Sequence, residues 1–271
     1  MILLGQELKM NERLAKLFDE AISVLQEHEP IEGYYVAFSG GKDSIVILDL
    51  VRRSGVKHDV HFNLTSVDPP ELIAFIKEHY PDVERHRPEQ TMFQLIERRG
   101  YYPMSRQKFC CATLKERGGA GRLVITGIRG AESLRRSHRT MFEISRTDET
   151  KRMIHIILDW TDRDVWEYIR TLNLPYCKLY DQGFKRIGCI GCPEAYYKER
   201  QRQFRLYPNH KKAYIEAMRR GMILKKRTDF ASADEMFEWW TSGMSKRKFL
   251  GRKEQTEINL IGVTNGNNGT N

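Results

Sequence analysis

YYVAFSGGKDS, residues 34–44, is the stretch of sequence that decides the fold. Its first half, Tyr34–Phe38, is a short apolar run of the kind found in a buried parallel strand. The glycine-rich turn Ser39–Ser44 follows at once, and a helical pattern then runs over residues 45–53 and ends at Gly55. A second apolar run at residues 60–64 completes the pattern, which predicts a βαβ unit.

The glycine-rich turn has the chemistry of a phosphate site. Its two glycines let the backbone approach an anion without interference from a Cβ atom. The free N–H groups and the dipole of the following helix favour negative charge at that point. Lys42 adds a positive charge, and Asp43 is a candidate to orient Mg²⁺ or a water molecule. The alternative is a Gly-Gly turn that carries a lysine and serines by chance. We predict a phosphate-binding loop formed by Ser39, Gly40, Gly41, Lys42, Asp43 and Ser44.

Strands and helices alternate over most of the chain. The expected further strands are residues 82–85, 123–127 and 155–158, and the expected further helices are residues 11–27, 70–80, 92–99 and 162–172. Capping boxes are expected at Thr161 with Asp164 and at Ser232 with Glu235. This alternation predicts an α/β fold with a mostly parallel sheet and helices on both faces.

Three segments are expected from the pattern. Residues 1–192 carry the α/β domain, residues 193–264 form a helical C-terminal extension without strands, and residues 265–271 are too polar to pack. No apolar run approaches the roughly 18 residues of a membrane span, and the first residues lack the pattern of an export signal. We therefore expect a cytoplasmic protein with no membrane partner.

The composition favours an anionic partner. The net charge is +9 and the pI is about 9.3, which suits nucleotides or nucleic acid, although a solvated basic surface gives the same numbers. Basic residues between positions 198 and 227 alternate with aromatic ones that could stack on bases or could equally be core. These aromatic residues are Tyr196, Tyr197, Phe204, Tyr207 and Tyr214.

Five cysteines, an odd number, argue for metal or redox chemistry rather than a disulfide framework. Four of them are an adjacent pair, Cys110 and Cys111, and a distant CxxC pair, Cys189 and Cys192. This is not the usual zinc spacing, because zinc sites commonly have two CxxC pairs. Cys177 stands apart, and a thiol of this kind is more often a small buried hydrophobe than a reactive group.

The glycine-rich turn is shorter than a Walker loop, and its lysine is followed by aspartate. It resembles the PP-loop of the ATP-pyrophosphatase superfamily, which cleaves ATP to AMP and pyrophosphate. Over roughly residues 34–193 the chain resembles the phosphoadenosine phosphosulfate reductase family within that superfamily. The blocks that carry the resemblance are residues 63–72, 127–133, 158–162 and 179–183. The resemblance implies an adenine nucleotide α-hydrolase-like fold that binds ATP with Mg²⁺.

Two further stretches are expected at the edge of the sheet where parallel strands end and ligands bind. Asp68 follows the second strand, where it could contact the ribose, Mg²⁺ or the acceptor, or could simply be a turn residue. Gly127 and Arg129 follow a later strand, and a guanidinium suits phosphate or sulfate. We expect Gly127 and Arg129 to bind the nucleotide, and Lys42, Asp43, Asp68 and Arg129 to be the catalytic residues.

The resemblance extends to the cysteines. Iron–sulfur sulfonucleotide reductases likewise combine Cys-Cys with CxxC, which implies a 4Fe-4S cluster on Cys110, Cys111, Cys189 and Cys192. Zinc and metal-free thiols are the alternatives. The reductases also carry a nucleophilic cysteine near the C-terminus, whereas no cysteine follows Cys192 here.

The lack of this terminal cysteine argues against a reductase. It favours an iron–sulfur ATP pyrophosphatase that adenylates an acceptor so that sulfur can replace oxygen. The pattern looks most like the ATP-pyrophosphatase component of DNA phosphorothioation systems, which implies nucleic acid and a cysteine desulfurase or other sulfur donor as partners. One alternative is a sulfonucleotide reductase with a displaced nucleophile such as Cys177. The other is a nucleotide-binding accessory module that does not cleave ATP.

Overall fold

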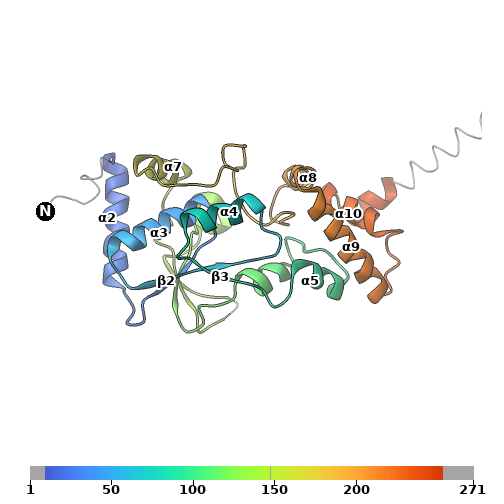
Figure 1. Ribbon diagram of the computed structural model, residues 1–271, viewed down its shortest axis with the longest axis horizontal. Coiled ribbons are helices and arrows are strands. Elements are labelled where there is room, and N and C mark those ends of the chain that lie inside the picture. Colours follow the sequence, from blue (N-terminus) through green and yellow to red (C-terminus); the bar gives the residue numbers. More distant parts are fainter. Residues whose placement is uncertain (1–9, 147, 253–271) are drawn as a thin grey trace, which may run out of the picture. The chain divides into compact units, whose positions relative to one another are not determined.

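The computed structural model describes residues 10–146 and 148–252, which form two compact units (Figure 1). The first unit comprises Met1–Glu89 and Cys110–Cys189, and the second comprises Gln90–Phe109 and Ile190–Asn271. The segment Gln90–Phe109, which we expected inside the α/β domain, therefore belongs with the C-terminal helices. The expected tail at residues 265–271 lies outside the described residues.

The first unit holds all the described strands. Its elements are α2 (Glu12–Glu27), β1 (Tyr34–Ala37), α3 (Lys42–Ser54), β2 (His58–Asn63), α4 (Pro70–His79), β3 (Glu84–His86), the π-helix η1 (Cys111–Lys115), β4 (Leu123–Ile125), the 3₁₀-helix η2 (Gly130–Glu132), α6 (Leu134–Ser137), β5 (Phe142–Ile144), β6 (Arg152–Ile154) and α7 (Asp162–Thr171).

The six strands form one sheet in the order β3-β2-β1-β4-β6-β5. All neighbours are parallel except β5 and β6, which are antiparallel. Val36 of β1 pairs with Val60 of β2 on one side and with Ile125 of β4 on the other. The chain therefore proceeds outward from β1 in both directions, so the sheet has a topological switch point between β1 and β4. The mostly parallel α/β sheet was predicted from the sequence and is confirmed.

The two faces of the sheet differ in polarity. Tyr34 and Val36 point into the apolar core that β1 shares with α2, α3, α4 and α7, and Figure 1 draws α3 and α4 along one side of the strands. On the opposite face, a Cβ atom added to Gly118 would lie 2.5 Å from the hydroxyl oxygen of Tyr35. The carbonyl of Lys115 in η1 accepts a hydrogen bond from Asn63 on this face, so the short helix η1 lies against it.

Local signals located most elements to within a few residues. The Asn11 side chain caps α2, and α3 ends at the left-handed Gly55. The capping box of Thr161 and Asp164 opens α7 as predicted. Ser232 caps α10 (Ala233–Ser242), but Glu235 accepts from the N–H of Ala231 instead of completing the box with the N-cap residue.

The strand expected at residues 155–158 is wrong. β6 ends at Ile154, and residues 156–159 form a turn in which the N–H of Leu158 donates to the carbonyl of His155. Ile156 and Ile157 are apolar because this turn is buried in the core. The sequence analysis also missed the short edge strand β5, whose outer positions are exposed and give no apolar run.

The second unit is helical. Its elements are α5 (Met92–Arg99), α8 (Tyr197–Leu206), α9 (Pro208–Leu224) and α10, and no strand occurs in residues 193–252. Trp240 stacks on Tyr102 with ring centroids 4.5 Å apart, and its indole N–H donates to the carbonyl of Pro103. A Cβ atom on Gly221 would lie 2.9 Å from the carbonyl oxygen of Glu97, so α5 and α9 pack closely. These contacts explain why residues 90–109 belong to this unit.

No helix within the described residues is both long enough and apolar enough to cross a membrane.

Candidate active site

Serine hydroxyls shape the glycine-rich loop between β1 and α3. The Ser44 hydroxyl donates to the carbonyl of Gly41 at 2.8 Å and accepts from the hydroxyl of Ser39 at 3.1 Å. Gly40 has φ +69°, and a Cβ atom there would lie 2.7 Å from Cδ1 of Leu72. Glycine is therefore required at position 40 both by the backbone conformation and by the close approach of α4.

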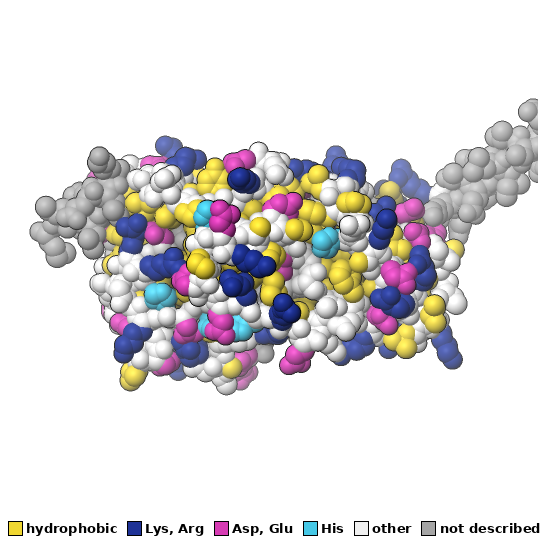
Figure 2. All heavy atoms as spheres, in the orientation of Figure 1, with side chains coloured by type: hydrophobic (Ala, Val, Ile, Leu, Met, Phe, Trp, Pro, Cys, Tyr) yellow, Lys and Arg dark blue, Asp and Glu magenta, His cyan; other side chains and the backbone are white. Residues whose placement is uncertain are grey.

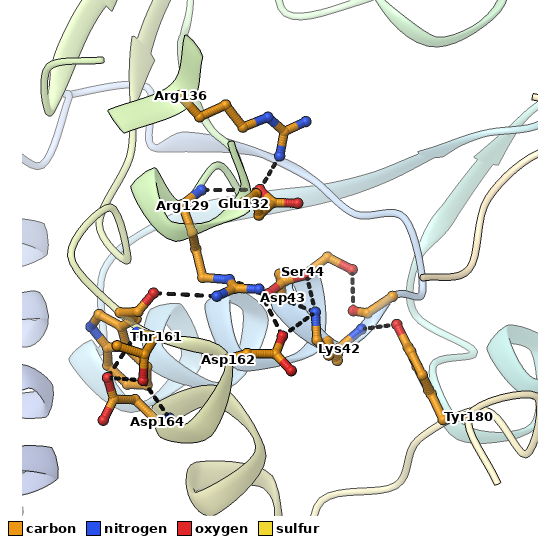
Figure 3. Close-up of polar contacts among 12 residues, drawn as sticks. Lys42, Asp43, Ser44, Arg129, Glu132, Arg136, Thr161, Asp162, Asp164 and Tyr180 are labelled. Atoms are coloured by element: carbon orange, nitrogen blue, oxygen red, sulfur yellow. Dashed lines mark hydrogen bonds and ion pairs between the residues drawn. The ribbon is translucent and has the colours of Figure 1, made fainter. Parts of the chain in front are cut away.

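The loop leads into the N-terminus of α3, with Gly41 as the N-cap. The N–H of Lys42 donates to the hydroxyl oxygen of Tyr180 at 2.9 Å, so a side chain from the segment after α7 occupies one anion-binding amide (Figure 3). Burial raises the pKa of Tyr180 and outweighs the opposite effect of this hydrogen bond. The oxygen on the Lys42 amide is therefore that of a neutral phenol.

Two cations and two carboxylates form a network beside the loop (Figure 3). Nζ of Lys42 lies 3.0 Å from Oδ2 of Asp43 and 3.1 Å from Oδ1 of Asp162. Arg129 completes the ring, with Nε 2.6 Å from Asp43 and Nη2 3.0 Å from Asp162. The side chains of Lys42 and Arg129 are only 6% and 3% exposed, whereas Asp162 is 65% exposed. Two buried positive charges are thus balanced by carboxylates, one of which is open to solvent.

The network joins loops that leave the two strands at the switch point. Lys42 and Asp43 follow β1, and Arg129 follows β4. A Cβ atom on Gly127 would lie 3.2 Å from Cβ of Asp43, so glycine permits the close approach of the two loops. Arg129 also donates to the carbonyl of Trp160 at 3.3 Å, which fixes the guanidinium in place.

More arginines lie behind Arg129. Glu132 accepts hydrogen bonds from the N–H of Arg129 and from the side chain of Arg136. Burial lowers the pKa of Arg136, and repulsion from Arg186 and Arg139 adds to that effect. Positive charge is therefore concentrated along this side of the site, which suits an anionic ligand.

Asp68 is held in the turn between β2 and α4. Its carboxylate accepts from the N–H of Thr65 at 2.7 Å, and Ser66 between them is in the left-handed region with φ +65°. This geometry is consistent with the alternative interpretation of Asp68 as a turn residue. The ion pairs of Lys42 and Arg129 described above are with Asp43 and Asp162.

Three of the four predicted cluster cysteines lie in the first unit. Cys110 precedes η1, Cys111 is its first residue, and the thiol of Cys189 donates to the hydroxyl oxygen of Thr65 at 3.4 Å. Cys192 belongs to the second unit. Among described residues, Cys110, Cys111 and Cys189 do not form a group whose sulfurs all lie within 4.8 Å. One zinc ion, with Zn–S bonds of about 2.3 Å, would hold them closer than that.

The basic helices of the second unit carry matching acids. Arg219 pairs with Glu216 and Asp234, and Arg227 pairs with Asp229. Figure 2 shows Lys and Arg side chains beside acidic ones over α9 and α10. Of the aromatic residues considered for base stacking, Phe204 and Tyr214 are buried in the core and Tyr196 is exposed.

Sequence reasoning missed Asp162 and Tyr180. Both residues lie in blocks that carry the family resemblance, residues 158–162 and 179–183, but no role at the site was assigned to either. Both reach the loop through contacts that span more than a hundred positions along the chain.

The chain is similar to a known protein family and to individual proteins from other organisms. The phosphoadenosine phosphosulfate reductase domain family matches residues 33–195. An uncharacterized protein of Methanocaldococcus jannaschii is 29% identical over 227 residues, covering 78% of this chain and 55% of that protein. An adenosine 5′-phosphosulfate reductase of Oceanobacillus iheyensis is 31% identical over 169 residues, covering 58% of this chain and 69% of that enzyme. The chain thus spans little more than half of the archaeal relative.

Among solved structures, FMN adenylyltransferase of Candida glabrata in complex with FAD and inorganic pyrophosphate has a similar fold. The TM-score is 0.51 at 16% identity, and the match covers 70% of this chain and 69% of the other. The likeness at this identity concerns the fold alone.

Proposed function

The chain belongs to the phosphoadenosine phosphosulfate reductase family of the PP-loop superfamily, and on that premise we propose that it cleaves ATP to AMP and pyrophosphate. The AMP is transferred to an acceptor, whose oxygen is afterwards replaced by sulfur. Several matching relatives are adenosine 5′-phosphosulfate reductases by name, and cleavage at the α-phosphate is the finer proposal made for this chain.

The observation that carries the proposal is the network of Lys42, Asp43, Arg129 and Asp162 at the switch point of the sheet. Open α/β sheets bind their ligands at such a point, beyond the carboxyl ends of the strands. The N-terminus of α3 directs its amides there, and two buried cations lie beside them. This is an arrangement suited to a polyphosphate.

The proposed reaction begins when an acceptor oxygen attacks the α-phosphorus. One P–O bond forms while the bond to the oxygen between the α- and β-phosphates breaks, and the electron pair leaves on pyrophosphate. Lys42 and the first amides of α3 would stabilise the growing charge on that leaving group. Arg129 would hold the α-phosphate in position, because its guanidinium is fixed by three partners.

Asp43 and Asp162 would hold Mg²⁺. They offer hard carboxylate oxygens beside the phosphate loop, and the 65% exposure of Asp162 leaves room for the water ligands that Mg²⁺ usually keeps. The bound ion would supply charge neutralisation to the phosphates. Lys42, which pairs with both carboxylates, would then be released toward the nucleotide, whereas Arg129 would keep its contacts.

The four cysteines are proposed to hold a 4Fe-4S cluster. Cys110, Cys111, Cys189 and Cys192 would each supply one thiolate. The cluster would supply thiolate-bound iron near the sulfur chemistry. The sulfur atoms of Cys110, Cys111 and Cys189 are spaced more widely than a single zinc ion requires. This spacing is consistent with a larger metal cluster.

We propose nucleic acid as the acceptor, with a persulfide as the sulfur source. The net charge of +9 supports an anionic macromolecule, although many basic side chains of the second unit have acidic partners. The terminal persulfide sulfur would attack the acceptor phosphorus, so that a P–S bond forms while the bond from that phosphorus to the adenylated oxygen breaks and the oxygen leaves on AMP. An external thiol would then reduce the resulting disulfide and leave the sulfur on the acceptor. A cysteine desulfurase is a suitable source of such a persulfide.

A sulfonucleotide reductase is the second candidate, since the family includes relatives with that name. In this chain its nucleophile would have to be Cys177, the cysteine outside the proposed cluster. Cys177 is 1% exposed, and burial raises the pKa of its thiol, so little of it would be the reactive thiolate. These two properties favour the pyrophosphatase.

Mass spectrometry decides between the two functions. Anaerobic protein is incubated with ATP, Mg²⁺, DNA or RNA and a persulfide donor, and the nucleic acid is digested and searched for a thio-modified nucleotide. In a parallel reaction, adenosine 5′-phosphosulfate and thioredoxin replace ATP and the donor. Thio-modification that depends on ATP supports the proposal, whereas sulfite release without thio-modification supports the reductase. ATP binding without either product would identify a nucleotide-binding accessory module.

A further inference from the structure

The face of the sheet away from the apolar core carries a row of polar residues on β2. Asp59 pairs with Tyr35 of β1, and His61 pairs with Glu84 of β3. His86 of β3 pairs with Asn63 in the same way. Because side chains two apart in a strand share a face, these residues lie on one side of the sheet.

Three of them bring metal-binding atoms together. Nδ1 of His61 lies 2.8 Å from Nε2 of His86 and 3.4 Å from Oε2 of Glu84. Nε2 of His86 is 3.6 Å from Oε1 of Glu84. Within residues 10–146 and 148–252 this is the only group of three such side chains whose ligand atoms all lie within 4.8 Å.

A fourth residue orients the most buried of the three. The carboxylate of Asp59 contacts Nε2 of His61, and Arg122 pairs with the same carboxylate. A carboxylate beside Nε2 of His61 favours the tautomer with the proton on that nitrogen and leaves the lone pair on Nδ1.

We propose that His61, Glu84 and His86 bind a divalent transition-metal ion of the zinc type, with Asp59 as the positioning residue. Two imidazole nitrogens and one carboxylate suit such an ion. The pairing of a ligand histidine with a carboxylate through its other nitrogen is the usual second layer of a zinc site.

The geometry requires little movement. Tetrahedral zinc with bonds of about 2.0–2.1 Å separates its ligand atoms by roughly 3.3 Å. Each histidine nitrogen already lies close to that distance from one oxygen of Glu84, Oε2 for His61 and Oε1 for His86. The 2.8 Å contact between the histidines must open by about 0.5 Å. Small ring rotations provide this, because the side chains of His86 and Glu84 are 34% and 64% exposed.

The ion would join β3, the three-residue edge strand, to β2. The exposure of Glu84 leaves the fourth position to water. The site uses none of the residues assigned to ATP or to the cysteine cluster, so it is independent of the proposed function.

Zn²⁺ binding to the chelator-treated full chain tests the proposal by competition with a chromophoric chelator. The wild type is expected to bind Zn²⁺ at this site. Glu84→Gln and His86→Ala should weaken that binding at least about tenfold, and Asp59→Asn by about 10–100-fold. The matched control is His79→Ala, which removes a half-exposed histidine of α4 outside the group.

Co²⁺ separates this site from the cysteines. Co²⁺ on His61, Glu84 and His86 should give ligand-field bands without sulfur-to-cobalt charge transfer, and those bands should disappear in Glu84→Gln. Circular dichroism of the metal-free variants checks that they fold. The proposal is overturned if the wild type binds Zn²⁺ only through thiolates, or if Glu84→Gln and His86→Ala bind as tightly as the wild type.

Discussion

Nε of Arg129 lies 2.6 Å from Oδ1 of Asp43, although 86 positions separate the two residues in the chain. Asp43 begins α3 after β1, and Arg129 follows β4. The contact therefore locks together the two loops that flank the switch point of the sheet. This ion pair couples the phosphate loop to the arginine loop, so we treat the two as one candidate site.

Gly40 and Gly55 distinguish two costs of adding a Cβ atom to a left-handed glycine, which are backbone strain and steric collision. Gly40→Ala should lower the free energy of unfolding by about 1–2 kcal/mol for its φ of +69°, and by a further 1–3 kcal/mol, roughly, for the collision with Leu72 and Ile76. Gly55→Ala is the matched control, since Gly55 has φ +74° but nothing within 4 Å of an added Cβ atom. Urea unfolding measures both variants, and equal losses would contradict the packing argument.

Tyr180→Phe should tighten the binding of a non-hydrolysable ATP analogue. A charged phosphate is a better acceptor than a neutral phenol, so ATP should displace the Tyr180 hydroxyl from the N–H of Lys42. Removing that hydroxyl leaves the amide without a competitor, which corresponds to about 0.5–1.5 kcal/mol, or roughly 2–13-fold. Calorimetry gives the dissociation constants. Weaker binding by Tyr180→Phe would mean instead that the hydroxyl donates to the nucleotide.

His155 should make the fold sensitive to mild acid. Burial lowers its pKa, and the opposing effect of Glu143 is smaller. Since the folded-state pKa lies below the unfolded value of about 6.5, acid protonates the unfolded chain first. The free energy of unfolding should then fall as pH drops below about 6.5, by at most about 1.4 kcal/mol per pH unit from this residue, until the folded-state pKa is reached.

Urea unfolding between pH 7.5 and 5 measures this slope. His155→Asn cannot titrate and retains a polar group for Thr126, which His155 contacts at 2.8 Å. The variant should lose part of the slope, and His79→Asn on the exposed side of α4 should keep it. An unchanged slope in His155→Asn would show that acid sensitivity has another source.

Iron content tests the assignment of the cysteines. Anaerobically purified protein should be brown, with about four irons per chain. Cys189→Ser should lose most of the iron, whereas Cys177→Ser should retain it because Cys177 lies outside the proposed ligand set. One equivalent of zinc without iron, or equal iron in Cys189→Ser and the wild type, would rule out the cluster.

Local patterns were sufficient to predict the centre of the fold. The apolar run at residues 34–38, the two glycines and the helical spacing up to Gly55 all depend on neighbours in sequence, and they yielded β1, the loop and α3. The apolar run at residues 155–158 misled the analysis because a buried turn and a buried strand both select isoleucine and leucine. Exposed β5 offered no such run.

The site itself was only half predictable. Lys42 and Asp43 belong to the loop, and Arg129 was expected from the end of a strand, but nothing local connects Asp162 or Tyr180 to them. The grouping of His61, Glu84 and His86 depends on the register between β2 and β3, which the sequence does not specify on its own. Long-range geometry of this kind requires the folded chain.

Pyrophosphate release from ATP tests the central claim most directly. It is measured with Mg²⁺, nucleic acid and a persulfide donor for the wild type, Lys42→Ala, Arg129→Lys and the surface control Lys16→Ala, whose side chain is 77% exposed. For both the wild type and Lys16→Ala, the amount of pyrophosphate released should equal the amount of AMP. Pyrophosphate release by Lys42→Ala should be slower by about 10²–10³-fold. Arg129→Lys should also be slower, because a lysine amine lacks the planar fork with which Arg129 contacts Asp43, Asp162 and the carbonyl of Trp160 at the same time. Release of phosphate and ADP by the wild type, or unchanged pyrophosphate release by Lys42→Ala, would contradict cleavage of ATP at this loop.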